Sequence, residues 1–246
     1  MKKIVINADD YGATKKISNE INSLYRKGYI SSTTVIANSD NLCRCTETIS
    51  YGLHINFIEF NALTNTQYFI EKGICNEHGV FNGNIRNIKL FSPYFCFKLY
   101  EEVKEQLYIA KNAGYEITHF DSHQHVHTKP GLLPLLLFIR INTGISKIRN
   151  TRMYPDSNKK IVVLLFKKLW TFILKKILRF QTSDFFCSYT EFYEKREEII
   201  KSNKNIEVML HPGLDEFEQE NELFLSTIEY ILNDIELVKF KDLVKD

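Results

Sequence analysis

The sequence lacks the marks of several protein classes. It has only five cysteines in 246 residues and no C-x-x-C pair, so it indicates neither a disulfide framework nor a zinc knuckle. Free thiols are typical of a reducing compartment. Acidic residues interrupt the N-terminal apolar segment by position 9, which is typical of a first β-strand and not of a signal peptide. We therefore expect a cytoplasmic protein.

Other features are missing as well. The chain has no run of about 18 apolar residues, which a membrane-spanning helix needs. It has no internal repeat, no low-complexity stretch and no glycine-rich phosphate-binding loop. The net charge of +2 is too small to indicate a nucleic-acid partner. What is present is ordinary for a soluble globular protein: 44% hydrophobic and 25% charged residues, enough for one large α/β domain.

Segments typical of strands and of helices alternate along the whole chain. Apolar or β-branched runs predict strands, and apolar residues at helical spacing predict the helices between them. The expected strands are 3–8, 32–37, 53–58, 116–123, 147–153, 185–189 and 206–210, and the expected helices are 16–27, 101–113, 132–141, 161–180, 191–202 and 218–232. This βα alternation predicts a mostly parallel sheet. The number of strands favours a distorted or incomplete (βα) barrel in a single domain spanning 1–246.

Two segments stand apart from this alternation. Residues 61–93 have turn signals and no clear period, so we expect a long loop or a small insertion. Residues 161–180 are apolar and carry four lysines and Arg179, which predicts a basic amphipathic helix. Such a helix usually packs on the sheet with its lysines in water, and we favour that interpretation. The alternative is a surface that contacts anionic lipid.

Unusual polar residues lie where the predicted strands end, which is where an α/β barrel builds its active site. They are Asp9 and Asp10, His54, the histidine-rich segment 119–127, Arg149, Arg152 and His211. A single histidine at such a point is more often structural than a ligand. An Asp-Asp pair before a glycine could also simply cap a turn.

The segment 119–127 is stronger evidence for a metal or catalytic site. His119, Asp121, His123, His125 and His127 alternate, so an extended chain would direct all five to one side. Burying that many ionisable groups together is costly without a metal or a catalytic role.

Imidazoles and a carboxylate are the usual ligands of a catalytic divalent ion. A second carboxylate could take a proton from water, and a histidine from another strand could protonate a leaving group. Asp9, Asp10, His54, His123 and His211 supply these groups, although composition leaves their individual roles open.

Four motifs resemble one known family in content and in order. They are NADDYG at 7–12, GLH at 52–54, THFDSHQHVH at 118–127 and LHPG at 210–213. They are similar to the motifs of the YdjC-like carbohydrate deacetylases. The resemblance implies a distorted (βα) barrel that removes acetyl groups from N-acetylated sugars, such as an N-acetylglucosamine oligosaccharide or glycoconjugate. It also implies a divalent metal, usually magnesium, with zinc and manganese as alternatives.

The resemblance assigns roles to residues. It implies Asp10, His54 and His123 as metal ligands, although Asp9 and Asp10 could exchange roles. Asp9 would be the base and His211 the acid. Asp121 could orient a ligand histidine, and His125, His127, Arg149 and Arg152 would be substrate contacts or support the ligands. A rival pair of ligands is His123 with His127, which a helical turn would bring together.

This chain also departs from the family pattern. Position 124 is Gln where the enzyme acting on chitin-derived sugars has His, and the stretch from Arg152 to Cys187 is unusually apolar and basic. These differences leave room for a lipid-linked sugar. Two other functions stay open: a metal-dependent phosphoesterase on a similar barrel, and a glycan- or lipid-binding protein with an inactive site. We expect a small carbohydrate substrate, no nucleic acid, and either a monomer or a homodimer.

Overall fold

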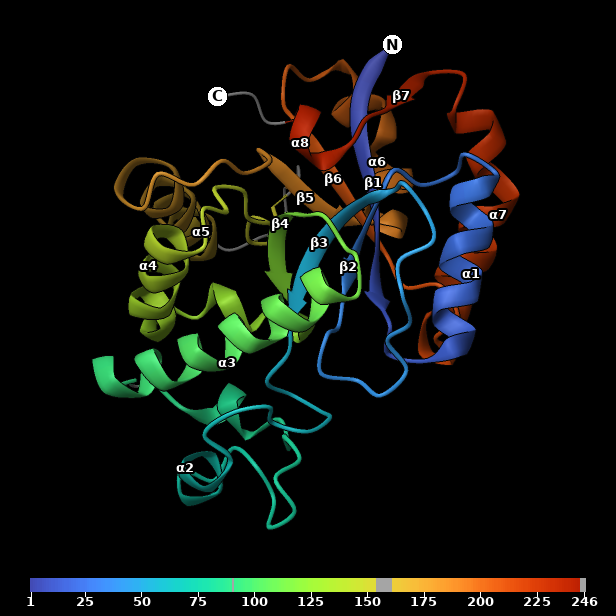
Figure 1. Ribbon diagram of the computed structural model, residues 1–246. Helices are drawn as coiled ribbons and strands as arrows, with labels where there is room; N and C mark the ends of the chain where they lie inside the picture. Colours follow the sequence, from blue (N-terminus) through green and yellow to red (C-terminus); the bar gives the residue numbers. More distant parts are fainter. Residues whose placement is uncertain (90, 154–160, 244–246) are drawn as a thin grey trace.

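The computed structural model describes residues 1–89, 91–153 and 161–243 of one α/β domain (Figure 1). Its strands are β1 (Lys2–Tyr11), β2 (Ser32–Val35), β3 (Ser50–Ile55), β4 (Ile117–Ser122), β5 (Phe185–Ser188), β6 (Ile206–Leu210) and β7 (Ile235–Leu237). Its α-helices are α1 (Lys15–Arg26), α2 (Thr66–Glu71), α3 (Pro93–Asn112), α4 (Leu133–Asn142), α5 (Ile161–Phe172), α6 (Tyr189–Lys201), α7 (Glu218–Ile231) and α8 (Phe240–Leu243). Short helical turns complete the fold: η1 (Asn84–Asn87), η2 (His123–Thr128), η3 (Pro130–Leu132), η4 (Ile173–Ile177) and η5 (Asp215–Phe217).

The strands form a parallel sheet that curls without closing. Their order is β4-β3-β2-β1-β6-β5, and β7 pairs with the start of β1. Between the edge strands β4 and β5 the described residues make isolated bridges, which join Phe120 to Ile148, Lys147 to Gln181 and Met153 to Phe186. The expected incomplete (βα) barrel is therefore confirmed. The expected regular strand at 147–153 is wrong, because this segment pairs first in parallel and then antiparallel with different partners.

Side-chain alternation along β1 explains the two environments of the sheet. Ile4, Ile6 and Ala8 pack in a core that contains the buried faces of α1, α6 and α7. The intervening Asn7 and Asp9 are also buried, but on the inner side of the curl. At the start of the strand, Val5 packs against Phe240 of α8. The interior is therefore apolar at one end and polar where the strands end.

Helices cover the outer side of the sheet in two groups. α1 and α7 lie on one flank, and α3 and α4 lie on the other (Figure 1). A second apolar core contains the buried faces of α3 and α4 together with Leu53 of β3 and Phe120 of β4. The inner side has its apolar packing at the start of β1, and the polar residues gather at the other end, where the strands end.

One expected helix begins earlier than predicted, and the expected insertion is ordered. α3 begins at Pro93, well before the expected 101, because the Ser92 hydroxyl accepts a hydrogen bond from the amide of Phe95 and Pro93 occupies the first turn. Segment 61–93 is an ordered insertion containing α2, η1 and antiparallel bridges such as Asn61 with Val80. Residue 90 of that segment lies outside the described residues.

The helix expected at 161–180 forms as α5 followed by the π-helical turn η4. Our favoured packing holds for one face only, where Trp170 and Leu174 are buried, because most of the other apolar side chains of α5 are exposed. Within the described ranges, no helix combines the length and the apolar character needed to cross a bilayer.

Candidate metal and catalytic site

A bulge at the end of β1 brings two consecutive carboxylates to the same side. Adjacent residues of a regular strand point to opposite faces, so Asp9 and Asp10 should diverge. The register of β1 against β2 shifts between Ala8 and Tyr11, and Asp10 adopts a left-handed φ of 68°. Aspartate tolerates this conformation better than most residues. As a result both carboxylates line the same cavity.

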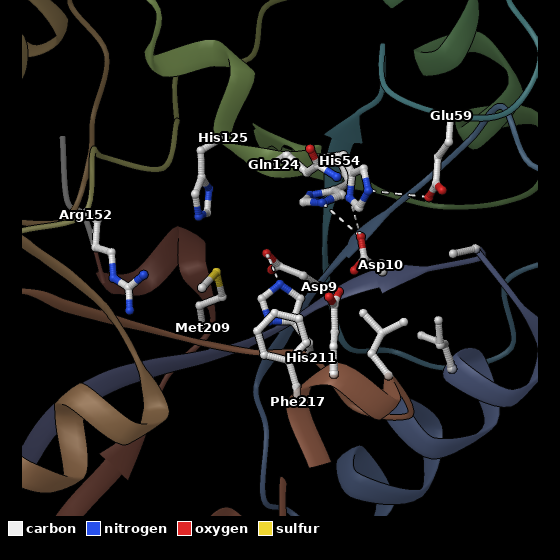
Figure 2. A pocket seen from close by; sticks show the side chains of 15 residues that line it. Asp9, Asp10, His54, Glu59, Gln124, His125, Arg152, Met209, His211 and Phe217 are labelled. Carbon is white, nitrogen blue, oxygen red and sulfur yellow. Dashed lines mark ion pairs between the residues drawn. The ribbon is translucent and has the colours of Figure 1, made fainter. Parts of the chain in front are cut away.

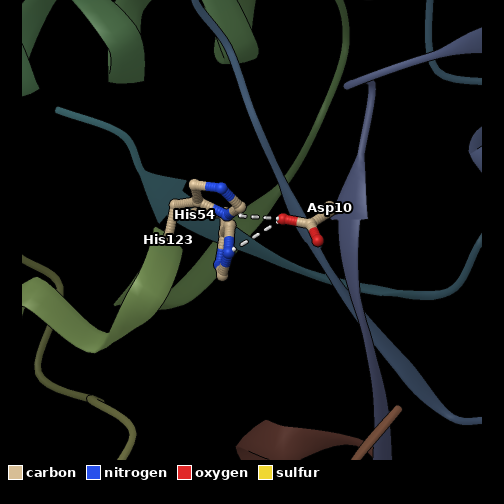
Figure 3. A group of neighbouring side chains, drawn as sticks. All are labelled: Asp10, His54 and His123. Carbon is tan, nitrogen blue, oxygen red and sulfur yellow. Dashed lines mark ion pairs between the residues drawn. The ribbon is translucent and has the colours of Figure 1, made fainter. Parts of the chain in front are cut away.

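Asp10 lies opposite two histidines from neighbouring strand ends (Figure 3). Its Oδ1 atom is 3.2 Å from Nε2 of His54 and 2.8 Å from Nδ1 of His123. One ligand atom from each of these residues lies within 4.8 Å of the others, which suits a single ion. Two imidazole nitrogens and one carboxylate oxygen on one side of a cavity leave coordination positions for water and substrate.

The far nitrogen of each histidine contacts a carboxylate. Nδ1 of His54 is 2.6 Å from Oδ1 of Asp121, and Nε2 of His123 is 3.4 Å from Oε1 of Glu59. A carboxylate in this position holds the proton on the far nitrogen and leaves the near nitrogen free to bind a metal. Asp121 therefore orients the ring of His54 with Nε2 toward Asp10, and Glu59 lies beside the far nitrogen of His123.

Behind Asp9 lies a buried guanidinium. Arg149 Nη1 and Nη2 donate to the two oxygens of Asp9 at 2.6 and 2.7 Å. Arg149 also forms an ion pair with Asp121, and its Nε donates to Glu207 at 2.6 Å. Arg149 is fully buried and does not line the cavity, so it holds carboxylates in place and does not contact the substrate space.

The charges of this interior are unequal. Burial raises the pKa of Asp9, but the charge and hydrogen bonds of Arg149 outweigh burial and hold that pKa well below its usual range. Burial raises the pKa of Glu207 to about 7 against the opposing effect of Arg149. Three buried carboxyl groups pair with this one arginine, and Asp10 is a fourth buried carboxyl group that faces two histidines instead. This excess of negative charge is what a divalent cation would balance.

The cavity beside these groups has a volume of about 340 Å³. His211, just after β6, lies with its Nε2 atom 3.8 Å from Oδ2 of Asp9 and its ring stacked on Phe217 at 4.1 Å (Figure 2). His125 and Arg152 form another part of the wall. The cavity therefore has a metal-ligand group, a carboxylate and a separate histidine on its wall.

The five alternating residues of the histidine run do not point to one side, so that expectation is wrong. β4 ends at Ser122, and Gln124 and His125 then take left-handed φ values of 51° and 56°, which reverses the chain. Asp121 and His123 reach the ligand group, and His125 lines the cavity. The strand geometry predicted for this run ends one residue before His123.

The rival ligand pair of His123 with His127 does not form. Nδ1 of His127 is 2.7 Å from the Ser122 hydroxyl and its Nε2 is 3.2 Å from the carbonyl oxygen of Arg149. His127 is thus a buried residue that braces the loop. It does not line the cavity.

His119 lies at the opposite end of the interior, stacked on Phe240 at 4.0 Å. Burial, followed by the charge of Arg149, lowers its pKa to about 3. A depressed pKa of this kind means that the unfolded chain binds a proton below about pH 6.5 while the folded chain does not, so stability falls as the pH falls.

We therefore expect His119→Gln to weaken the pH dependence of stability. Between about pH 6 and pH 4 the slope of the unfolding free energy should decrease by about 1.4 kcal/mol per pH unit. Urea unfolding of the two proteins at several pH values measures this slope. Equal slopes would mean that His119 is protonated in the folded protein.

Several residues that build the site were not predicted from the sequence. Glu207 and Glu59 are among them, as are Asn7 and Thr34, which donate to Asp9 at 2.8 and 3.4 Å. Glu207 had a detectable signal, since it is a single charge inside the apolar strand 206–210. For Asn7 and Thr34, the only sequence signal was the alternation of side chains along their strands.

Comparisons with known proteins agree with this geometry. A family model described as YdjC-like protein matches residues 3–234. A Vibrio cholerae protein named carbohydrate deacetylase is 29% identical over 140 residues, covering 54% of this chain and 53% of the relative. The chain thus matches about half the length of that relative. A carbohydrate deacetylase of Oceanobacillus iheyensis is 23% identical over 239 residues, covering 92% of this chain and 93% of the relative.

One solved structure has a similar fold over its full length. It comes from Enterococcus faecalis V583 and is described as a candidate cellobiose-phosphate cleavage protein. The TM-score is 0.74 with 19% identity, and the match covers 99% of both chains. At this identity the likeness concerns the fold.

Proposed function

Since the chain belongs to the YdjC-like family, we propose that it removes acetyl groups from N-acetylated sugars by metal-dependent hydrolysis. The observation that carries this proposal is the ligand group Asp10, His54 and His123 beside Asp9 and His211 in one cavity. The names of the curated relatives, carbohydrate deacetylase, support the same reaction.

The residues present fit a divalent metal. Asp10 Oδ1 is fully buried and faces two imidazole nitrogens whose far sides are held by Asp121 and Glu59. Such an ion supplies Lewis-acid chemistry when bound, polarising the acetyl carbonyl and making the attacking water more acidic. The nitrogen-rich donor set suits zinc, while the family resemblance favours magnesium, so the metal is a question for the experiment.

Asp9 is placed to act as the general base. Its carboxylate lines the cavity next to Asp10, and Arg149 fixes both of its oxygens from behind. The low pKa keeps Asp9 ionised at neutral pH but also makes it a weak base, so it would take a proton from the attacking water because a bound metal makes that water more acidic. Arg149 acts as a positioning residue because it contacts Asp9 and not the substrate space.

His211 is placed to act as the general acid. Its ring comes from β6, on the other side of β1 from His54, and is held by stacking on Phe217. From there it can protonate the departing amine of the sugar as the amide bond breaks. His125 lines the same cavity, and its buried Nδ1 has no hydrogen-bond partner within the described part of the chain. We assign it to the substrate.

Acetate release tests this function. Purified protein stripped with EDTA would be given Mg²⁺, Mn²⁺ or Zn²⁺ and a panel of N-acetylglucosamine compounds, from monosaccharide and chitobiose to nucleotide- and lipid-linked forms. We expect release that depends on the metal and falls by at least about 10³-fold in His123→Ala, because a ligand is lost.

His78→Ala is the matched control, since His78 lies outside the cavity and is exposed. It should retain full activity. Metal bound in the wild-type protein without acetate release from any compound would contradict the proposed reaction and favour a phosphoesterase or a binding protein.

A further inference from the structure

Helix α5 presents an apolar surface to solvent. The six consecutive side chains 161–166 expose between 36% and 75% of their area, and Leu169 and Phe172 expose 56% and 54%. Single exposed apolar side chains are common on proteins, but a contiguous group marks an interaction surface. We call the side chains of Ile161, Val162, Leu165, Phe166, Leu169 and Phe172 the α5 surface.

The opposite face of this helix is firmly attached. Trp170 of α5 and Leu174 of the following turn are buried in the core shared with α3 and α4. The Thr171 hydroxyl donates to Oδ1 of Asn150 at 3.0 Å, and Lys167 donates to the carbonyl oxygen of Arg152. The α5 surface is therefore the outer side of an anchored helix.

The segment of the sequence that contains this surface is strongly positive. Residues 131–183 contain eleven Lys and Arg and one acidic residue, Asp156, so they carry a net +10 while the whole chain carries +2. Arg149 is neutralised inside the protein and Lys175 pairs with Asp184 at 2.7 Å. Lys168, Lys176 and Arg179 are exposed on α5 and the turn after it. Lys168 lies one helical turn from both Leu165 and Phe172.

The exposed apolar side chains and the positive charge together indicate which partner binds the α5 surface. A second copy of the chain docked about a two-fold axis through α5 would bring two positive surfaces together, which costs free energy. An anionic lipid surface can bind both the apolar side chains and the positive charges. The apolar side chains enter the acyl region while the lysines extend to the phosphates. We propose that the α5 surface docks on an anionic lipid bilayer, with the helix lying in the plane of the interface.

The position of α5 relates this surface to the cavity. Arg152, whose carbonyl oxygen accepts from Lys167 of α5, also lines the cavity beside the metal-ligand group. Docking would therefore hold the cavity close to the membrane. If docking is combined with the proposed function, on which this step rests, the substrate is an acetylated sugar at a membrane surface, such as a glycolipid headgroup.

Vesicle flotation tests the docking without any need for activity. The probes are vesicles of phosphatidylcholine alone and vesicles with about 30% phosphatidylglycerol. We expect the protein to float with the anionic vesicles only, and about 0.5 M NaCl to reduce the bound fraction because lysine attraction is screened. Leu165→Glu with Leu169→Glu, and separately Lys168→Glu with Lys176→Glu, should each lower the vesicle affinity at least about tenfold.

Lys15→Glu with Lys27→Glu is the matched control. It makes the same change of net charge on α1, which lies on the other flank of the sheet from α5 (Figure 1). This pair should keep the wild-type affinity within about twofold, since its lysines are far from the bilayer. Equal loss in the control and the α5 lysine pair would overturn a specific docking surface.

Two other outcomes would also overturn the proposal. One is wild-type protein that does not float with anionic vesicles. The other is a stable dimer in analytical ultracentrifugation that Leu165→Glu with Leu169→Glu dissociates, which would assign the α5 surface to a second copy. Acetate release from chitobiose by these variants reports separately on the proposed function, because neither pair touches the cavity.

Discussion

Replacing Asp9 with asparagine is expected to lower kcat for acetate release by about 10²–10⁴-fold while metal binding is retained. Asparagine has the same shape as aspartate but cannot accept the proton of the attacking water. The fold should tolerate the change, since Arg149 keeps ion pairs with Asp121 and Glu207. The measurement is a steady-state rate with each active metal, together with the metal dissociation constant from calorimetry.

Substitution of the neighbouring Asp10 should instead weaken metal binding. Asp10→Asn removes the charged oxygen that faces His54 and His123, so we expect metal affinity to fall by at least about 100-fold. Added metal should restore part of its activity, whereas no metal concentration should restore that of Asp9→Asn. Comparing the two variants separates the base from the ligand.

One result would contradict the assignment of Asp9 as the base and Asp10 as the ligand. Loss of metal binding in Asp9→Asn with retention in Asp10→Asn would exchange the two roles. Asp9, His54 and Asp121 do form a second group of closely spaced ligand atoms. We assign the metal to the first group because Asp9 and Asp121 of the second group already pair with Arg149.

The sequence predicted the strands that carry the site because each strand has a simple local pattern. The apolar run before Asp9, the β-branched run at 32–37 and the apolar strand 206–210 all form where expected. Strand ends follow from such patterns, and parallel strands bring their carboxyl ends together. For this reason Asp9, Asp10, His54, His123 and His211 could be grouped from the amino-acid sequence, whereas the choice of Asp10, His54 and His123 as ligands came from the family resemblance.

Backbone conformations that depend on distant contacts could not be predicted in this way. The bulge that turns Asp10 inward and the reversal at Gln124 and His125 have no periodic signal. The partners of Arg149 come from β1, β4 and β6, so its pairing follows from the curl of the sheet. Exposure of α5 was missed because an apolar helix usually covers a core.

Replacing Arg149 with methionine is expected to produce the largest loss of stability. Methionine has a similar length but no charge, so Asp9, Asp121 and Glu207 would be left buried without their cation. Removing one member of a buried charged cluster typically costs about 3–5 kcal/mol. For a domain of this size that corresponds to a decrease in Tm of about 6–20 °C.

The loss of stability in Arg149→Met should also depend on pH. Arg149 depresses the pKa of Asp9, so the stabilisation from this pair is complete above the unfolded pKa of about 3.9 and is lost as the pH falls through the folded pKa. The difference in stability between wild type and Arg149→Met should therefore be largest near neutral pH and should narrow below about pH 4. Thermal unfolding across this range measures it.

Arg152→Met is the matched control for Arg149→Met. Arg152 has the same charge and lies on the same segment, but its side chain is 44% exposed and pairs with one carboxylate, Glu191, at 2.7 Å. A surface pair of this kind contributes about 0–1 kcal/mol. Equal Tm values for the two variants would mean that the buried carboxyl groups are neutral in the folded protein, and Asp9 could then not be the ionised base that the proposed hydrolysis requires.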